Sequence, residues 1–163
     1  MAQLEMIREQ TKAAGLSAHI YLSTGLKTWT KLQFAGRGRD VHTRPIGFAA
    51  YVQATARARA IVDLPHPLQT GLTMRAVEAI GAGKKLLTTA RDVHAYVGFD
   101  TDNVRILDPD RPIIDPSFLA APMAPTSAQA IERYSLRTWA LDVLGVTEPA
   151  TFLNTQSNGW TAS

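Results

Sequence analysis

Between residues 60 and 89 the chain alternates buried-strand and helix patterns in an order that few folds permit. Ala60-Ile61-Val62-Asp63-Leu64 is a brief apolar run, typical of a strand buried on both faces. A polar loop follows, then a helix expected over 73–81, and glycines at 81 and 83 lead into a second strand at 85–89. Strands separated by helices indicate a parallel sheet with right-handed crossovers and helices on both faces.

The same alternation extends along the rest of the chain. Further helices are expected over 2–14, 46–58, 91–96 and 127–144, and further strands at 18–22, 41–43 and 104–107. Two segments are expected to be irregular: 24–40, a basic loop anchored by Trp29 and Phe34, and 108–126, which contains five prolines. The sequence therefore predicts an α/β fold: a single Rossmann-like domain over 1–146, followed by a flexible polar tail over 147–163.

Composition narrows the class of protein. The chain has 163 residues, 45% of them hydrophobic and 19% charged, which is enough for one buried core. The net charge is +3, and the 17 basic residues are scattered, a pattern that favours small anions as ligands and not a nucleic acid. No cysteine is present and the four histidines are isolated, so we expect no disulfide, metal or cofactor.

The sequence also bears on location. It begins without the apolar core of a signal peptide, and no run of about 18 apolar residues marks a membrane span. We therefore expect a cytoplasmic protein with no transmembrane segment. Association with a membrane surface remains compatible with the sequence.

The loop after the strand at 60–64 is the best candidate site, because ligands of parallel sheets bind beyond the carboxyl ends of the strands. A helix N-terminus offers backbone N–H groups and the positive end of its dipole to a phosphate. The Arg75 guanidinium can grip a phosphate through two hydrogen bonds, and Glu78 can accept hydrogen bonds from sugar hydroxyls. The predicted nucleotide-sugar-binding residues are His66, Gln69, Thr70, Gly71, Leu72, Thr73, Arg75, Glu78 and Lys84.

Each of these residues also has a purely structural interpretation. Thr73 suits an N-cap, a role compatible with a neighbouring phosphate. Arg75 and Glu78 are three residues apart on one helix, where an exposed ion pair contributes only about 0.2–0.5 kcal/mol. A lone loop histidine such as His66 is commonly just exposed, and one of Lys84 and Lys85 is expected to be a solvated flank of the strand. The glycines suit turns and a helix end.

The run from Gln69 to Thr89, Gln-Thr-Gly-Leu-Thr-Met-Arg-Ala-Val-Glu-Ala-Ile-Gly-Ala-Gly-Lys-Lys-Leu-Leu-Thr-Thr, supplies a more specific indication. It resembles the carboxy-terminal domain of bacterial polysaccharide and lipopolysaccharide biosynthesis proteins related to GT-B glycosyltransferases. The resemblance extends upstream through Ile61-Val62-Asp63-Leu64 and downstream to the helix containing Tyr134-Ser135-Leu136-Arg137-Thr138-Trp139, and covers about residues 16–145.

The resemblance implies the donor-side half of a glycosyltransferase, which grips a nucleotide sugar. Retaining members often carry two glutamates eight residues apart, the later one holding the ribose. Glu78 matches the later position, whereas Thr70 stands at the earlier one. Such enzymes react in a cleft between two Rossmann-like domains, and only one is expected here, so an acceptor domain or partner chain would have to complete the catalyst.

Two other functions remain open at this point. The chain could be a non-catalytic nucleotide-binding or assembly module that keeps the fold and lacks the chemistry. A receiver domain of the response-regulator type is the third alternative, and it would need an acidic cluster at the strand ends, where Asp63 stands alone.

Overall fold

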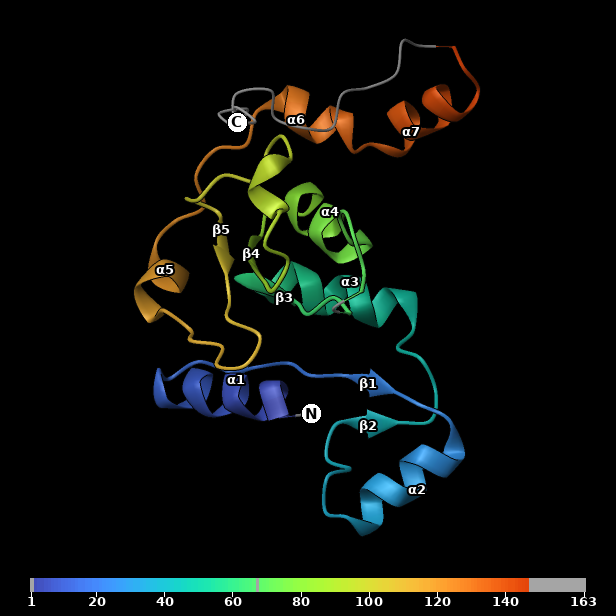
Figure 1. Ribbon diagram of the computed structural model, residues 1–163, viewed down its shortest axis with the longest axis vertical. Helices are drawn as coiled ribbons and strands as arrows, with labels where there is room; N and C mark the ends of the chain where they lie inside the picture. The colour runs from blue at the N-terminus through green and yellow to red at the C-terminus, as the bar shows by residue number, and fades with distance from the viewer. Residues whose placement is uncertain (1, 67, 147–163) are drawn as a thin grey trace, which may run out of the picture. The chain divides into compact units, whose positions relative to one another are not determined.

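The computed structural model describes residues 2–66 and 68–146. Its contacts divide the chain into two compact units, which Figure 1 shows with their helices and strands labelled. The first unit runs to Ala58 and includes Pro112–Ile114, and the second begins at Arg59 and resumes at Asp115. Both units contain parallel strands with helices around them, so the predicted α/β class is confirmed.

The first unit contains a two-stranded parallel sheet and three helices. Its elements are α1 (Ala2–Ala13), β1 (Leu22–Ser23), α2 (Leu26–Phe34), β2 (Val41–His42) and α3 (Phe48–Arg57). Strands β1 and β2 pair with Leu22 opposite Val41. The predicted helices over 2–14 and 46–58 are confirmed, as is the extended piece at 41–43. The predicted strand at 18–22 is wrong over most of its length, since β1 begins only at Leu22.

Helix α2 replaces the irregular loop that we expected over 24–40. Its inner side is held by two side-chain donors: Trp29 Nε1 donates to the Val41 carbonyl oxygen at 3.1 Å, and Gln33 Nε2 donates to that of Gly38 at 3.1 Å. Gly36, with a φ of +68°, turns the chain just beyond the helix. The predicted anchoring role of Phe34 is wrong, because this side chain is 94% exposed.

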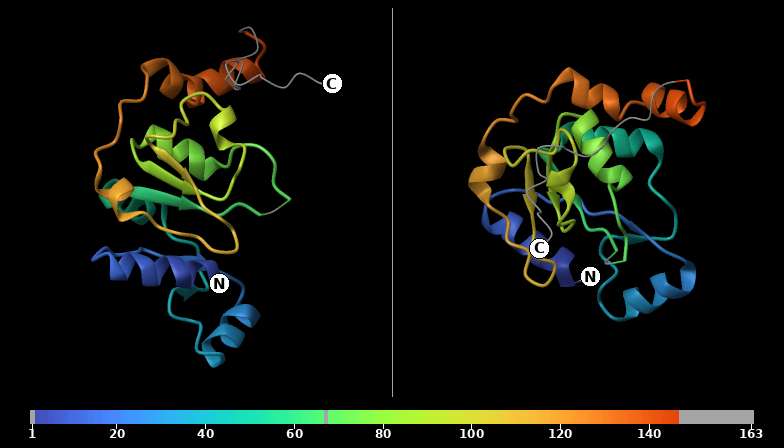
Figure 2. Two further views of the ribbon diagram at one scale, coloured as in Figure 1. Left: turned by 60° about the vertical axis from the view of Figure 1, so that its left-hand side comes forward. Right: turned by 45° about the horizontal axis from the view of Figure 1, so that its top comes forward.

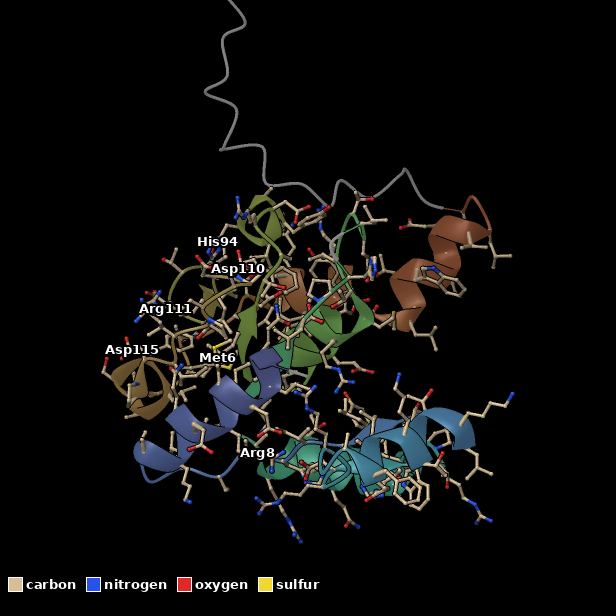
Figure 3. The ribbon with its side chains drawn as sticks, turned by 60° about the horizontal axis from the view of Figure 1, so that its bottom comes forward. Met6, Arg8, His94, Asp110, Arg111 and Asp115 are labelled. Atoms are coloured by element: carbon tan, nitrogen blue, oxygen red, sulfur yellow. The ribbon has the colours of Figure 1, made fainter. Side chains whose placement is uncertain are left out.

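A partly buried ion pair links α1 to the segment before β2. Arg8 of α1, labelled in Figure 3, donates a hydrogen bond from its guanidinium to the carboxylate of Asp40. The hydrogen bond to Asp40 raises the pKa of Arg8 above its ordinary value. Asp40 is the one acidic residue between Thr24 and Arg59, so this pair neutralises the only negative charge of a long basic segment.

The second unit is built on a three-stranded parallel sheet. Its elements are β3 (Ala60–Asp63), α4 (Met74–Gly81), β4 (Lys85–Thr88), the 3-10 helix η1 (Val93–Ala95), β5 (Val104–Ile106), α5 (Pro116–Ala120), α6 (Ala128–Arg133) and α7 (Leu136–Val143). The strand order is β3-β4-β5, with Ile61 opposite Leu86 and Leu86 opposite Val104. The predicted strands at 60–64, 85–89 and 104–107 and the helix over 73–81 are therefore confirmed.

Helices cover both faces of the central strand β4. Ala79 and Ile80 of α4 form a buried cluster with Ile61 and Leu86, and Figure 2 shows α4 lying against β3 and β4. Side chains alternate along a strand, so Lys85 faces the other side. There its Nζ donates to the Phe118 carbonyl oxygen of α5 at 2.6 Å and lies 4.3 Å from the Phe118 ring centre. The expected helices on both faces of the sheet are present.

The chain beyond β5 contains more separate helices than its sequence pattern predicted. The expected single helix over 127–144 is interrupted. Helix α6 ends at Arg133, and α7 starts afresh because the Ser135 hydroxyl accepts a hydrogen bond from the Thr138 backbone N–H at 3.1 Å. Within the proline-rich segment, Asp115 caps the short helix α5 and Pro116 occupies its first turn. The predicted tail over 147–163 lies outside the described residues.

Candidate functional site

A buried carboxylate lies at the carboxyl ends of β3 and β4, just before α4. The Asp63 side chain is at the last position of β3, and one of its oxygens, Oδ2, accepts hydrogen bonds from two hydroxyls. Thr73 Oγ1 donates from 2.9 Å and Thr88 Oγ1, at the end of β4, donates from 3.2 Å. Asp63 therefore ties the loop before α4 to both strands.

The same two hydroxyls also organise the backbone. Thr73 Oγ1 accepts a hydrogen bond from the Ala76 N–H at 3.0 Å, which confirms the N-cap interpretation of Thr73. Thr88 Oγ1 accepts from the Ala90 N–H at 3.1 Å. The Asp63 carboxylate, bonded to the capping hydroxyl, thus places negative charge near the positive end of the helix dipole. It already provides part of the charge that a bound phosphate would bring to this end of α4.

The described residues of the loop before α4, His66 and 68–72, combine an anchored end with an exposed middle. Leu72 packs against the core cluster of the second unit, so it holds the loop to the sheet. The His66 Nδ1 accepts a hydrogen bond from the Leu68 N–H at 3.2 Å, which gives this histidine a local structural role. Gln69 and Thr70 are exposed, and both are available to a ligand arriving from solvent.

Gly71 is the conformational centre of this loop. Its φ of +81° belongs to the left-handed region that side chains other than glycine rarely adopt. A Cβ at this position would lie 3.7 Å from the Tyr96 hydroxyl, so Tyr96 approaches the loop closely. Sequence reasoning did not single out Tyr96, because nothing in the spacing between η1 and Gly71 indicates their contact.

Arg75 and Glu78 lie together on the surface of α4. Arg75 Nε is 3.9 Å from Glu78 Oε2, and their side chains are 48% and 40% exposed. This ion pair agrees with the structural interpretation of their three-residue spacing. It also leaves both groups accessible beside the loop, within the first turn or two of the helix.

Lys84 is separated from the other predicted site residues. Gly83, with a φ of +61°, ends α4, and the Lys84 N–H donates to the Ala79 carbonyl oxygen at 2.9 Å. Eight helical residues span about 12 Å, so Lys84 and Arg75 stand at opposite ends of α4. Gln69, Thr70, Gly71, Thr73 and Arg75 lie within a seven-residue stretch at the start of α4, whereas Lys84 lies beyond its other end.

Asp63, Thr88 and Tyr96 are the residues of this region that the sequence prediction left out. In the sequence, Asp63 is only a lone acidic residue at a strand end, where a receiver domain would need a cluster. Its two hydroxyl partners and its burial, with 7% of its surface exposed, now give it a structural role. A useful signal was present in the sequence, since a polar residue that ends a buried strand has to find hydrogen-bond partners.

Other polar residues outside this region have local roles. His94 Nδ1 lies 2.7 Å from the Phe99 carbonyl oxygen; Figure 3 labels His94. Asp108 and Asp115 have pKa values lowered by hydrogen bonds to nearby groups, Asp110 N–H being the largest cause for Asp108 and the Ser117 hydroxyl for Asp115. Residues 2–66 and 68–146 include no group of three or more side chains suited to a metal ion.

Within the part of the chain that the structure describes, no helix has the length and apolar character needed to cross a bilayer. Comparison with protein-family models, curated proteins and solved structures finds no match to this chain.

Proposed function

We propose that this chain is the nucleotide-sugar-binding half of a GT-B-like glycosyltransferase of cell-surface polysaccharide biosynthesis. The observation that carries the proposal is the loop ending at Thr73. It leaves the carboxyl end of a parallel strand, turns at a left-handed glycine and enters a helix with an accessible arginine. Parallel α/β sheets bind nucleotides at this position. The resemblance of residues 69–89 to polysaccharide biosynthesis proteins supports the same ligand class.

The diphosphate is held on the solvent side of this loop in our proposal. The Thr73 hydroxyl donates its hydrogen bond to Asp63 and not to the phosphate. The phosphate is therefore bound by the positive charge of Arg75. The Arg75–Glu78 pair is exposed and contributes at most about 0.5 kcal/mol, so this pair opposes movement of the guanidinium to a phosphate only weakly. Gly71 has no side chain, so the backbone at this position can approach the ligand closely.

Glu78 has a second role in this proposal. The Glu78 carboxylate, whose side chain is 40% exposed, accepts hydrogen bonds from the ribose hydroxyls of the nucleotide in this proposal. Glu78 follows Arg75 by three residues on one helix face, so the two can contact adjacent parts of one nucleotide. His66, Leu72 and Lys84 contribute less directly: His66 and Leu72 shape the loop, and Lys84 lies beyond the far end of α4.

Glycosyl transfer requires stabilisation of the negative charge that builds on the departing diphosphate. Arg75 supplies positive charge at that point in our proposal. The acceptor and the group that removes its proton would come from an acceptor domain or a partner chain. We therefore expect the isolated chain to bind a nucleotide sugar without efficient turnover.

Calorimetric titration with UDP, GDP and ADP, and with UDP-glucose, tests this function. The Arg75→Gln variant should bind the preferred diphosphate roughly 10- to 100-fold more weakly, because a charge-assisted hydrogen bond contributes about 1.5–3 kcal/mol. Arg137→Gln is the matched control, since Arg137 of α7 forms an exposed pair with Glu132 of α6 at 3.6 Å. Equal affinities for the wild type and Arg75→Gln would remove Arg75 from the site.

A non-catalytic module is the second candidate, and the buried Asp63 carboxylate favours it. A buried carboxylate near the start of α4 repels an incoming anion, by about 3 kcal/mol for charges ~5 Å apart at an effective dielectric constant of 20. A well-folded protein that binds none of the four probes would support this module and contradict the glycosyltransferase proposal.

A further inference from the structure

We propose that the outer face of α2, formed by Leu26, Lys27, Lys31 and Phe34, docks this protein on an anionic lipid surface. The inference goes beyond the proposed function, and nucleotide binding plays no part in it. It rests on three observations in the first unit: the position of these residues on one side of the helix, the exposure of the two apolar side chains, and the surrounding positive charge.

The four residues lie on the side of α2 that turns away from the rest of its unit. At 100° per residue, positions 26, 27, 31 and 34 fall within an arc of about 140°. Trp29 and Gln33 lie outside this arc, and they make the hydrogen bonds to Val41 and Gly38 that hold the helix. No residue of α2 is fully buried. The helix, which Figure 1 labels, is therefore fixed from one side only.

The two apolar residues of this face remain largely exposed in the fold. Leu26 is 66% exposed and Phe34 is 94% exposed. An aromatic ring with nearly its whole surface in water is the kind of group that inserts at a lipid interface. Neither residue is needed to hold α2 in place, since the contacts of its inner side do this.

The charge around the face is uniformly positive. Lys27 and Lys31 belong to the face itself, and Arg37 and Arg39 follow within five residues of Phe34; all four residues are exposed. Residues 24–39 contain no aspartate or glutamate, and the carboxylate of Asp40 is engaged by Arg8. A surface of this charge is complementary to an acidic partner.

Lipid fits this combination better than nucleic acid. An interfacial helix sets lysines beside leucine and phenylalanine, with the apolar groups in the acyl boundary and the charges at the headgroups. Single-stranded nucleic acid binds on successive stacking rings, and this face offers one ring beside an aliphatic side chain. The exposed apolar residues Leu136 and Trp139 of α7 differ, because Arg137 is offset there by Glu132 and Asp142.

Co-sedimentation of the full chain with vesicles tests the proposal. We expect binding to phosphatidylcholine vesicles that contain roughly 30–40% phosphatidylglycerol, because this anionic lipid gives the vesicle a negative surface potential. We expect little binding to pure phosphatidylcholine vesicles. Each lysine near an anionic surface changes binding by roughly fivefold. The double variant Lys27→Gln/Lys31→Gln should therefore bind the vesicles about 25-fold more weakly. Added salt should weaken vesicle binding by the wild type.

Matched variants separate the α2 face from a general hydrophobic effect. Phe34→Ser should reduce vesicle binding by roughly tenfold, in line with the loss of an inserted aromatic ring, whereas Leu136→Ser on α7 should leave it unchanged. Circular dichroism of each variant checks that the helices are retained. Equal binding to neutral and anionic vesicles, or α2 variants that bind as the wild type does, would overturn the proposal. It would also be overturned if a single-stranded RNA oligonucleotide bound through Lys27 and Lys31 while vesicles did not.

Discussion

At the residue scale, Thr73 shows how one hydroxyl serves two parts of the structure. It accepts from the Ala76 N–H, which starts α4, and it donates to Asp63, which ends β3. An N-cap was predictable, because a threonine directly before an apolar helical pattern is a common helix start. The donated hydrogen bond was not predictable, since it joins Thr73 to a strand ten residues earlier.

Thr73→Ala should lower the free energy of unfolding by about 2–3 kcal/mol. Loss of the cap accounts for roughly 1 kcal/mol, and loss of a donor to the buried Asp63 carboxylate accounts for about 1–2 kcal/mol more. Urea denaturation followed by circular dichroism measures the change. Thr73→Ser is the control, because it keeps the hydroxyl and should lose well under half as much stability. Similar losses for both variants would show that the methyl group, and not the two hydrogen bonds, stabilises this position.

At the scale of elements, Tyr134 joins the break between α6 and α7 to the loop after η1. Its hydroxyl donates to the Val97 carbonyl oxygen at 2.8 Å, and its ring packs edge-to-face on Phe99 at 5.6 Å. Burial raises the pKa of Tyr134 to about 12. The neutral phenol is therefore the form that the folded protein favours.

Stability should depend on the ionisation of Tyr134 at high pH. An unfolded tyrosine has a pKa near 10, so the stabilisation from neutral Tyr134 is complete below about pH 10 and is lost as the pH rises towards 12. Urea midpoints should be measured between about pH 9 and about pH 12, a range that brackets these pKa values. With rising pH they should fall more steeply for the wild type than for Tyr134→Phe. Parallel curves for the two proteins would contradict a raised pKa.

The elements themselves divide into those with a strong local signal and those decided by contacts. The strand–helix–strand order over 60–89 was predicted because buried strands, an amphipathic helix and Gly83 agree with one another. Helix α2 was missed because its glycine-punctuated, basic sequence resembles a loop. It forms where Trp29 and Gln33 reach carbonyl oxygens of the following segment. The break after α6 was missed because Ser135 lies within an otherwise continuous apolar pattern.

At the scale of the whole molecule, residues more than a hundred positions apart hold the first unit together. Gln10 of α1 donates from Nε2 to the Pro112 carbonyl oxygen at 2.6 Å and accepts at Oε1 from the Ile114 N–H at 2.7 Å. The segment Pro112–Ile114 thereby belongs to the first unit, although the chain on either side of it belongs to the second.

Gln10→Met should destabilise this unit by about 1–3 kcal/mol, because both backbone groups lose a partner while the side-chain volume is kept. Hydrogen exchange of the Ile114 amide should accelerate in the variant by a factor that matches the loss in stability. Gln53→Met is the control, since Gln53 is exposed on α3. Unchanged exchange at Ile114 would show that the amide is protected by other contacts.

The sequence by itself determined the α/β class, the parallel strands of the second unit and the position of the loop ending at Thr73. These features follow from local patterns: short apolar runs, glycines that turn the chain and a threonine suited to cap a helix. Only the tertiary structure decided that Asp63 is satisfied by Thr73 and Thr88 and that Pro112–Ile114 joins α1. The physical reason is that these contacts join segments distant in the sequence. A buried polar group requires a hydrogen-bond partner, but the local sequence does not indicate which residue provides it.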